Sequence, residues 1–529
     1  MLLSFVLLSP FVYMLLSSTY YIPGIDEVYQ LQAAKELVLH GHYESIRDFA
    51  GGDLAHPVLT YVNAWPIGYS FVIALLLKVG FSIGTSAVIV QLVTALLGTS
   101  LWIALSSRLL KNFFYQALFG CFIVLHYLTW GIYSTAAITW ALTPLLAMFA
   151  LRFFKDRSGI TANDFSNCFL SGALTGVLIL FRFQNIIFVG AYFLLFAVIY
   201  KKSRKKFSSV FLLYSVIPVF TYLGISYFNK INSGYSSFVT KHFKLDFSWS
   251  WRWPLDILRA FLLGAMRLDE LLFALARQAN MASFGSLLCY CVTILATPLL
   301  VFYCYQVWQQ KSYASSMMIW FIACFCSLIT LLLGLAVFMN YLNLPLGRYY
   351  HFLLPLFILL VIKGISLRPR PFWLKSTLRN SVLLLIIFST GVLVAKYSGY
   401  RKRLNVDFAE KSSRVISEVL KIEAQYAHLP TFVMTDHLFG AFIVGLYRPV
   451  YGSAQTDEIF GDGRNYFSED TLLFLVTDLH PLKPEYESMP NLDALAHLYG
   501  MQLKKTGSVD IYWKKFSRGA LFSQRVADP

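Results

Sequence analysis

Charged residues are scarce in this chain of 529 residues: only 14% are charged, whereas 57% are hydrophobic. The apolar residues come in runs of about twenty, the length that crosses a bilayer core of about 30 Å. A soluble protein could not bury so much apolar surface. The first run, residues 2–17, lacks the basic n-region and the A-x-A-like site of a signal peptide, so it is expected to be the first membrane span.

Cysteine provides no structural framework. All seven cysteines fall inside apolar segments, and none shows the Cys/His spacing of a zinc site or the exposed pairing of a disulfide scaffold. They are interpreted as small hydrophobic residues.

The formal charge of +16 lies mostly in short stretches between apolar segments, such as residues 201–206 (KKSRKK) and 368–370 (RPR). Basic loops of this kind mark the cytoplasmic side of a membrane protein. The charge is therefore explained by topology, and nucleic acid is not an expected partner.

The apolar runs predict about eleven transmembrane helices, with residues 66–82 as an additional helix that lies in the interface without crossing. Only that choice places all the basic loops on the side of the N-terminus. The expected location is a bacterial inner membrane with a cytoplasmic N-terminus, and residues 20–85, 229–281, 340–349 and those after about 398 face outward. The predicted spans are 2–19, 86–107, 113–131, 136–154, 166–181, 184–200, 207–228, 282–308, 316–339, 350–367 and 379–397.

The first outer loop should begin with a short helix lying flat on the membrane. Apolar residues recur at helical spacing at Val28, Leu31, Ala34 and Val38, and Gly41 is expected to end the helix. The second outer loop carries three alternating tryptophans and then an amphipathic helix with Arg259 and Arg267 off its apolar face. This helix is expected to rest in the headgroup layer, or alternatively to form a lid over a site.

After residue 398 the composition resembles that of a soluble domain. Short β-rich runs (431–436, 472–477 and 509–513) alternate with helical ones (408–426, 437–447 and 491–499), which predicts a small α/β extracytoplasmic domain. The segment has no Gly-rich phosphate loop, nucleophile elbow or metal-ligand spacing, so binding or bracing is expected rather than catalysis. The predicted domains are 1–397, an all-α polytopic bundle, and 398–529.

Two adjacent carboxylates, Asp26 and Glu27, follow the first span. At a helix N-terminus the helix dipole keeps such groups ionised, and an ionised carboxylate can act as a general base. Acidic residues are also common in first turns for purely structural reasons, so a capping role is the alternative.

Four segments follow one another along the chain in this order: IDEVYQLQAAKELVLHGHYE, HPVLTYVNAWPIGYSFVIALL, GVLILFRFQN and LGRYYHFLLPLFILL. This order resembles the C-type membrane glycosyltransferases, which include the protein O-mannosyltransferases and the lipid A aminoarabinose transferases. The matching features are an acidic residue after the first span, a W-P-x-G-Y turn before a non-crossing helix, and an R-Y pair near a late span. The resemblance covers roughly residues 20–370.

The resemblance implies a glycosyltransferase that moves a sugar from a polyprenyl-phosphate donor to a lipid, polysaccharide or protein on the outer side of the membrane. Asp26 matches the first-loop aspartate and becomes the candidate base, with Glu27 assisting it or only capping the helix. Arg348, with Tyr349, is the candidate for the donor phosphate, because a guanidinium binds phosphate in bidentate fashion. The alternative for Arg348 is an arginine that snorkels to the interface.

Three further residues are candidates. Arg182 interrupts an apolar stretch, so it is expected either to contact phosphate or sugar or to form a hydrogen bond between spans. Lys244, a basic residue on an outward loop, is another candidate for phosphate. No cofactor is required, although His56 and an acidic residue of its loop could bind a divalent metal.

The competing hypothesis is a non-catalytic transporter, flippase or envelope-assembly protein. Transporters normally show repeated halves and ionisable residues near the bilayer midplane. This sequence shows no such repeat, and its candidate residues lie at the outer ends of spans.

Overall fold

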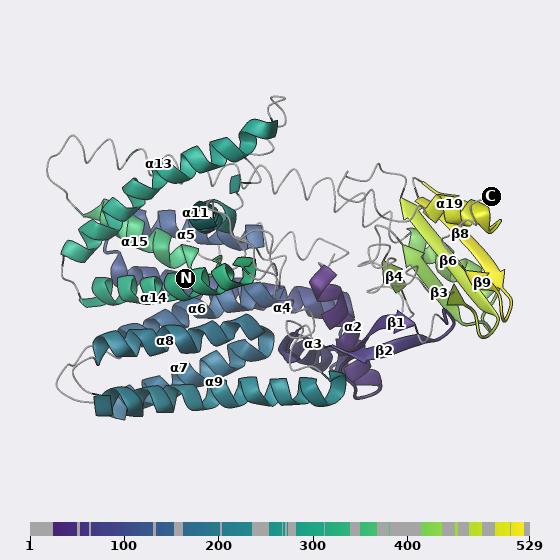
Figure 1. Cartoon of the computed structure of the whole chain (residues 1–529), viewed down its shortest axis with the longest axis horizontal. Coiled ribbons are helices and arrows are strands. Elements are labelled where there is room, and N and C mark those ends of the chain that lie inside the picture. Colours follow the sequence, from purple (N-terminus) through teal and green to yellow (C-terminus); the bar gives the residue numbers. More distant parts are fainter. Residues whose placement is uncertain are drawn as a thin grey trace. The chain divides into compact units, whose positions relative to one another are not determined.

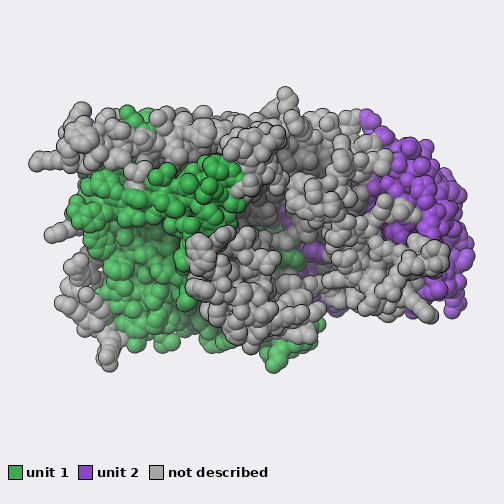
Figure 2. All heavy atoms as spheres, turned by 45° about the horizontal axis from the view of Figure 1, so that its top comes forward, with its two compact units in different colours: residues 1–15, 63–69, 89–397 green, residues 16–62, 70–88, 398–529 purple. Residues whose placement is uncertain are grey.

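The protein is described by a computed structural model in which two compact units can be distinguished (Figure 2). Unit 1 comprises residues 1–15, 63–69 and 89–397, and unit 2 comprises residues 16–62, 70–88 and 398–529. The residues that the structure describes are 25–49, 53–62, 65–130, 134–152, 162–200, 204–234, 253–266, 268–269, 272, 282–310, 313–338, 350–367, 380, 414–435, 450–452, 465–478, 492–507 and 509–522.

Unit 1 is a bundle of apolar helices (Figure 1). Helix α7 packs against both α6 and α9, α8 packs against α14, and α13 packs against α15. Each helix coincides within a few residues with a predicted span, because long apolar runs satisfy their backbone groups internally as helices. The helices are α4 (Ile83–Leu109), α5 (Phe113–Trp130), α6 (Ser134–Arg152), α7 (Ala162–Phe181), α8 (Ile187–Ile199), α9 (Arg204–Ser233), α13 (Ala282–Gln309), α14 (Tyr313–Phe338) and α15 (Leu354–Ser366), with a 3-10 turn, η2 (Phe183–Ile186), before α8.

Four helical segments within the described residues are long and apolar enough to cross a membrane: Ile83–Leu109, Thr135–Arg152, Lys206–Ser233 and Phe284–Gln309. Six shorter apolar helices accompany them. The chain is therefore a membrane protein with several apolar helices. The predicted first and last spans, 2–19 and 379–397, lie outside the described residues apart from residue 380.

The helix predicted in the first loop is confirmed as α2 (Ile25–Leu39). Gly41 follows with φ +76°, the left-handed conformation that ends helices and that glycine adopts without strain. Residues 31–35 are all buried, so the middle of α2 is enclosed on every side rather than on one face. An antiparallel hairpin that the sequence did not predict then joins β1 (Glu44–Phe49) to β2 (Pro57–Tyr61).

The predicted helix at 66–82 is confirmed as α3 (Gly68–Lys78), which has 11 residues. At about 1.5 Å per residue it extends about 16 Å, roughly half of an apolar bilayer core. Its length agrees with a helix that does not cross.

The C-terminal part of unit 2 contains a five-stranded sheet in the order β4-β3-β6-β8-β7. Strand β3 (Thr431–Thr435) is parallel to β4 (Val450–Gly452) and to β6 (Thr471–Asp478). Strand β8 (Val509–Phe516) is antiparallel to β6 and to β7 (Gln502–Thr506). The three predicted β-rich runs coincide with β3, β6 and β8, whereas β4, β7 and the small β5–β9 pair (Asn465–Tyr466 and Leu521–Phe522) were not predicted.

Both faces of this sheet are buried. Val433 and Phe474 face a cluster that includes residues of a helix at 414–424, whereas Phe432 and Leu475 face a second cluster with α19 (Leu492–Leu498). Alternate residues of each strand thus cover opposite faces, the period-2 pattern of a sheet between helices. The predicted helical runs 408–426 and 491–499 contain these two helices, and the run 437–447 lies outside the described residues.

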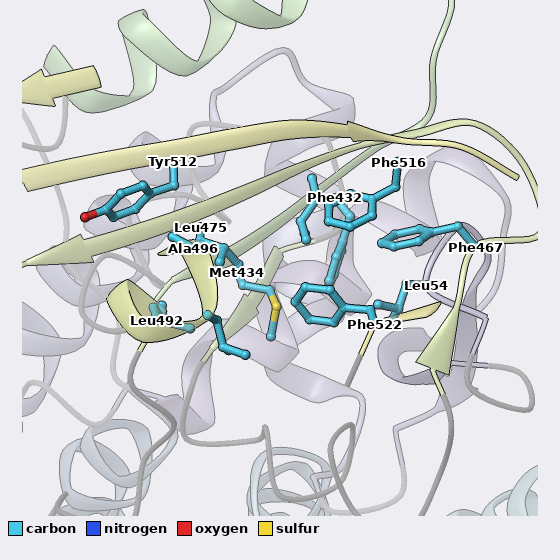
Figure 3. Packing of buried hydrophobic residues seen from close by; sticks show 12 residues of the cluster. Leu54, Phe432, Met434, Phe467, Leu475, Leu492, Ala496, Tyr512, Phe516 and Phe522 are labelled. Carbon is cyan, nitrogen blue, oxygen red and sulfur yellow. The ribbon is translucent and has the colours of Figure 1, made fainter. Parts of the chain in front are cut away.

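The second cluster includes Leu54, which comes from the β1–β2 hairpin rather than from the C-terminal segment (Figure 3). It lies with Phe432, Phe467 and Phe522 and is only 1% exposed. A residue of the first loop therefore completes a core that the C-terminal segment builds.

The amphipathic helix of the second loop is α11 (Trp253–Leu262), followed by a 3-10 turn, η3 (Gly264–Met266). Its polar side packs on α13: the Tyr290 hydroxyl donates to Asp256 Oδ1 at 2.5 Å, and Arg259 lies 3.7 Å from the same carboxylate. The Arg259 side chain is only 11% exposed. The ion pair with Asp256 and the Tyr290 ring, 5.5 Å from the guanidinium, therefore hold Arg259 against α13.

Candidate functional site

The two candidate carboxylates lie in the first turn of α2, as predicted. Asp26 is the second residue of the helix and Glu27 the third. Glu27 is only 3% exposed, although a carboxylate that merely complements the helix dipole usually remains in water. Burial of a carboxylate requires partners, so Glu27 lies in an enclosed polar environment.

Further along α2, three long polar side chains, Gln30, Gln32 and Lys35, are also buried. The Ser70 hydroxyl donates to the backbone oxygen of Gln30 at 2.7 Å and fixes this turn of the helix. Burial lowers the pKa of the Lys35 ammonium to about 8, and the neighbouring Glu36 carboxylate only partly counteracts that effect. Lys35 could not be singled out from the sequence, because its position in the helix gave no sign that every side of α2 would be covered.

His56 lies at the tip of the β1–β2 hairpin, between carboxylates. Its Nδ1 is 3.1 Å from Asp53 Oδ2 and 3.0 Å from Ser468 Oγ, and its Nε2 is 3.4 Å from Glu469 Oε1. The acidic residue of the same loop that was expected near His56 is therefore Asp53. In the part of the chain that the structure describes, no group of three or more His, Cys, Asp or Glu side chains is arranged to hold a metal ion.

Arg182 lies at the junction between α7 and η2. Its Nε donates to Gln184 Oε1 at 3.0 Å, an interaction that orients the guanidinium. Asn185, buried beside it, donates through Nδ2 to Thr139 Oγ1 at 2.9 Å and to the Leu178 carbonyl at 2.7 Å. Asn185 therefore forms a hydrogen bond between spans directly beside Arg182.

The W-P-x-G-Y turn packs against the same end of α7. A methyl group on the Cα of Gly68 would lie 2.5 Å from the Leu180 carbonyl oxygen, closer than any tolerable contact. Glycine is therefore required at this position, and Tyr69 beside it is fully buried. The motif has a structural reason: glycine lets the turn lie against the backbone of Leu180 on α7, two residues before Arg182.

A pair of buried histidines, His126 near the end of α5 and His351 just before α15, escaped the sequence analysis. His351 Nε2 donates to the Ala136 carbonyl at 2.9 Å. The His126 ring stacks between Phe122 and Trp140. The only available signal was a histidine inside each of two apolar runs, FIVLHYLTW and RYYHFLLP.

The contacts of Asn185 and His351 lie at one end of the helix bundle. They involve the beginning of α6, the end of α7 and the residues just before α8 and α15. Because consecutive helices run in opposite directions, these are the ends that the charge pattern predicts to face outward.

Three predicted site residues, Arg348, Tyr349 and Lys244, lie outside the described residues. The described chain resumes directly after the R-Y pair with Tyr350, which is buried and whose hydroxyl lies 3.3 Å from Thr330 Oγ1.

Comparison with solved structures identifies the fold. The crystal structure of ArnT from Cupriavidus metallidurans in the apo state matches with a TM-score of 0.50 at 13% identity, covering 96% of this chain and 97% of that chain. The chain therefore has the fold of the C-type membrane glycosyltransferases, as the four sequence segments predicted. Within that class it is similar over nearly its whole length to ArnT, a lipid A aminoarabinose transferase.

Two other structures match less well. ArnT from Cupriavidus metallidurans bound to undecaprenyl phosphate gives a TM-score of 0.49 at 12% identity and covers 96% of this chain and 97% of that chain. The archaeal oligosaccharyltransferase AglB from Archaeoglobus fulgidus, in complex with an inhibitory peptide and a dolichol-phosphate, gives 0.48 at 10% identity and covers 97% of this chain and 74% of that chain. No family model and no curated protein sequence matches this chain.

Proposed function

We propose that the protein is an integral-membrane glycosyltransferase that moves a sugar from a polyprenyl-phosphate donor to a lipid, polysaccharide or protein acceptor. The reaction takes place on the outer face of the inner membrane, and the N-terminus is cytoplasmic. The observation that carries the proposal is the C-type fold over 96% of the chain, together with an acidic pair in the first turn of α2, where the resemblance requires a base.

Asp26 acts as the general base. It removes the proton from an acceptor hydroxyl as that oxygen attacks the anomeric carbon of the sugar. The bond between the anomeric carbon and the phosphate oxygen breaks, and the lipid phosphate leaves with the electron pair. Glu27, the buried neighbour of Asp26 on α2, assists this base or only caps the helix.

Cationic side chains stabilise the departing phosphate. Arg182, oriented by Gln184, takes this role among the described candidates. Arg348 and Lys244 are proposed for it from the sequence, with the Tyr349 hydroxyl as a hydrogen-bond donor beside Arg348. Fixed cations that face a developing negative charge lower the barrier because they need no reorganisation during the reaction.

The test is sugar transfer by the full chain in membrane vesicles that contain donor lipid. Asp26→Asn keeps the size of the side chain but removes the base, so transfer should fall by about 10²-fold or more, the contribution typical of a general base. Glu36→Gln is the matched control: it lies on the same helix, and its carboxylate pairs with the exposed His40.

The control should retain transfer within about twofold, because an exposed ion pair contributes little. Equal activity of Asp26→Asn and wild type would remove the proposed base.

A further inference from the structure

The hairpin between β1 and β2 is attached to the C-terminal part of unit 2 at its tip. The Leu54 N–H donates to the Tyr466 carbonyl at 2.9 Å, and Asp53 pairs with Tyr466 as an isolated parallel bridge. The Leu54 side chain fills the core between Phe432, Phe467 and Phe522 (Figure 3). Segments about four hundred positions apart in the chain thus share one sheet edge and one apolar cluster.

Asp53 reinforces this attachment. Its Oδ1 accepts from the Ser468 N–H at 3.0 Å and from the Ala55 N–H at 3.1 Å, and its Oδ2 faces His56 at 3.1 Å. Burial alone would raise the pKa of the Asp53 carboxyl, but the hydrogen bonds from Ser468, Ala55 and His56 outweigh it, so its pKa lies below the ordinary range. Asp53 is therefore an ionised carboxylate that joins both segments. Asp53 and Leu54 thus hold the hairpin to Tyr466 and Ser468 of the C-terminal segment.

The other end of the hairpin contacts α2. Strand β1 packs on α2, the Tyr43 and Tyr61 rings meet edge to face at 5.6 Å across the hairpin, and Ser70 holds the Gln30 backbone. Because α2 and the hairpin are in contact and are also connected by the short turn at residues 40–43, we expect a displacement of the hairpin to displace α2 as well.

We propose that Asp53 and Leu54 are positioning residues, through which the C-terminal domain holds the hairpin and, with it, helix α2 in its working position. This inference rests on the proposed function, because α2 begins with the proposed base Asp26. It gives the C-terminal domain, which carries no catalytic motif of its own, a defined part in catalysis.

The test uses the full chain in detergent or vesicles, with two variants and a control. Leu54→Ala empties the buried position, and Asp53→Asn keeps the shape of the side chain but removes the charge. Leu503→Ala is the matched control, because Leu503 lies on β7, the edge strand of the five-stranded sheet, and is 43% exposed.

The first measurement is hydrogen exchange of the peptides that cover residues 25–39 and 44–62. Leu54→Ala should speed exchange in both peptides on the order of tenfold, as expected when a buried leucine loses its packing, while the exchange of α7 and α9 stays unchanged. Leu503→Ala should leave both peptides as in wild type. If exchange rises only at residues 53–56 and α2 remains protected, the positioning role is overturned.

The second measurement is kinetic. In Leu54→Ala and Asp53→Asn the kcat for sugar transfer should fall about tenfold while the KM for the donor stays within about twofold, because misplacing the base affects the chemical step more than donor binding. Unchanged kcat in variants whose α2 exchanges faster would also overturn the proposal. If wild type transfers no sugar, the proposed function fails, and the exchange measurement decides the positioning role without it.

Discussion

Helices α7 and α9 approach more closely than side chains normally allow, and this contact permits a quantitative prediction. Gly172 and Gly176 form a G-x-x-x-G pair on α7 that faces Tyr214 and Ile217 of α9. A methyl group on the Cα of Gly172 would overlap the Tyr214 carbonyl oxygen, a backbone atom that cannot turn aside. Beside it, Thr175 Oγ1 lies 2.8 Å from the Tyr214 hydroxyl in a buried hydrogen bond. Small residues of this kind allow membrane helices to pack backbone to backbone.

The perturbation is Gly172→Ala, and the matched control is Gly224→Ala on α9, where a methyl group would meet nothing within 4 Å. Both substitutions gain about 1 kcal/mol of helix propensity, so that gain cancels in the comparison. Forcing one extra methyl group into a packed contact costs about 1–3 kcal/mol. The free energy of unfolding of Gly172→Ala should therefore lie about 1–3 kcal/mol below that of Gly224→Ala.

The assay is thermal unfolding of both variants in one detergent at one scan rate, followed by the loss of the monodisperse peak on size exclusion. A fixed rate is needed because membrane proteins often unfold irreversibly. Gly172→Ala should unfold at a lower temperature than wild type, and Gly224→Ala at the same or a higher temperature. Equal unfolding temperatures for the two variants would show that α7 and α9 do not touch at Gly172.

Two other predictions follow from buried polar groups. Asn185→Leu removes the hydrogen bonds to Thr139 and to the Leu178 carbonyl, so it should lower the free energy of unfolding by about 1–3 kcal/mol. The control Asn232→Leu, at an exposed asparagine of α9, should change the free energy of unfolding by less than about 0.5 kcal/mol. Burial holds the pKa of Lys35 at about 8, below the value of 10.5 that an exposed lysine has. The charged ammonium therefore lowers the free energy of unfolding below about pH 8, and this destabilisation disappears as the pH rises towards 10.5. At pH 7 the free energy of unfolding of Lys35→Met should therefore exceed that of wild type by an amount on the order of 1–3 kcal/mol. Urea unfolding should show this difference shrinking by pH 10. A difference that stays constant with pH would show that Lys35 is not buried as a charge.

The helices could be predicted from the sequence because length and apolar content decide them locally. Strands β3 and β6 were predictable for a similar reason, since both of their faces are buried and their central residues form continuous apolar runs. Strand β8 was predictable from the β-branched and aromatic residues of VDIYW at its start. Strand β7 escaped because it is an edge strand, QLKKT, whose lysines protect an exposed edge and leave no apolar alternation.

The candidate site was only partly predictable. A carboxylate pair after the first span and a glycine at the start of α3 can be predicted locally, and the structure shows both at helix starts. The pairing of Leu54 with Tyr466 could not be read, because periodicity carries no information about contacts between segments so far apart. The burial of Lys35 and His126 escaped for the same reason: other segments cover them.

The proposed reaction breaks the bond between a sugar and a polyprenyl phosphate. The most direct measurement uses purified wild-type protein in proteoliposomes with a labelled polyprenyl-phosphate sugar and an extract of envelope lipids, polysaccharides and proteins. We expect the label to move to an acceptor and free polyprenyl phosphate to appear in equal amount, and we expect Asp26→Asn to abolish both. A folded wild-type protein that consumes none of a panel of polyprenyl-phosphate sugars would contradict it.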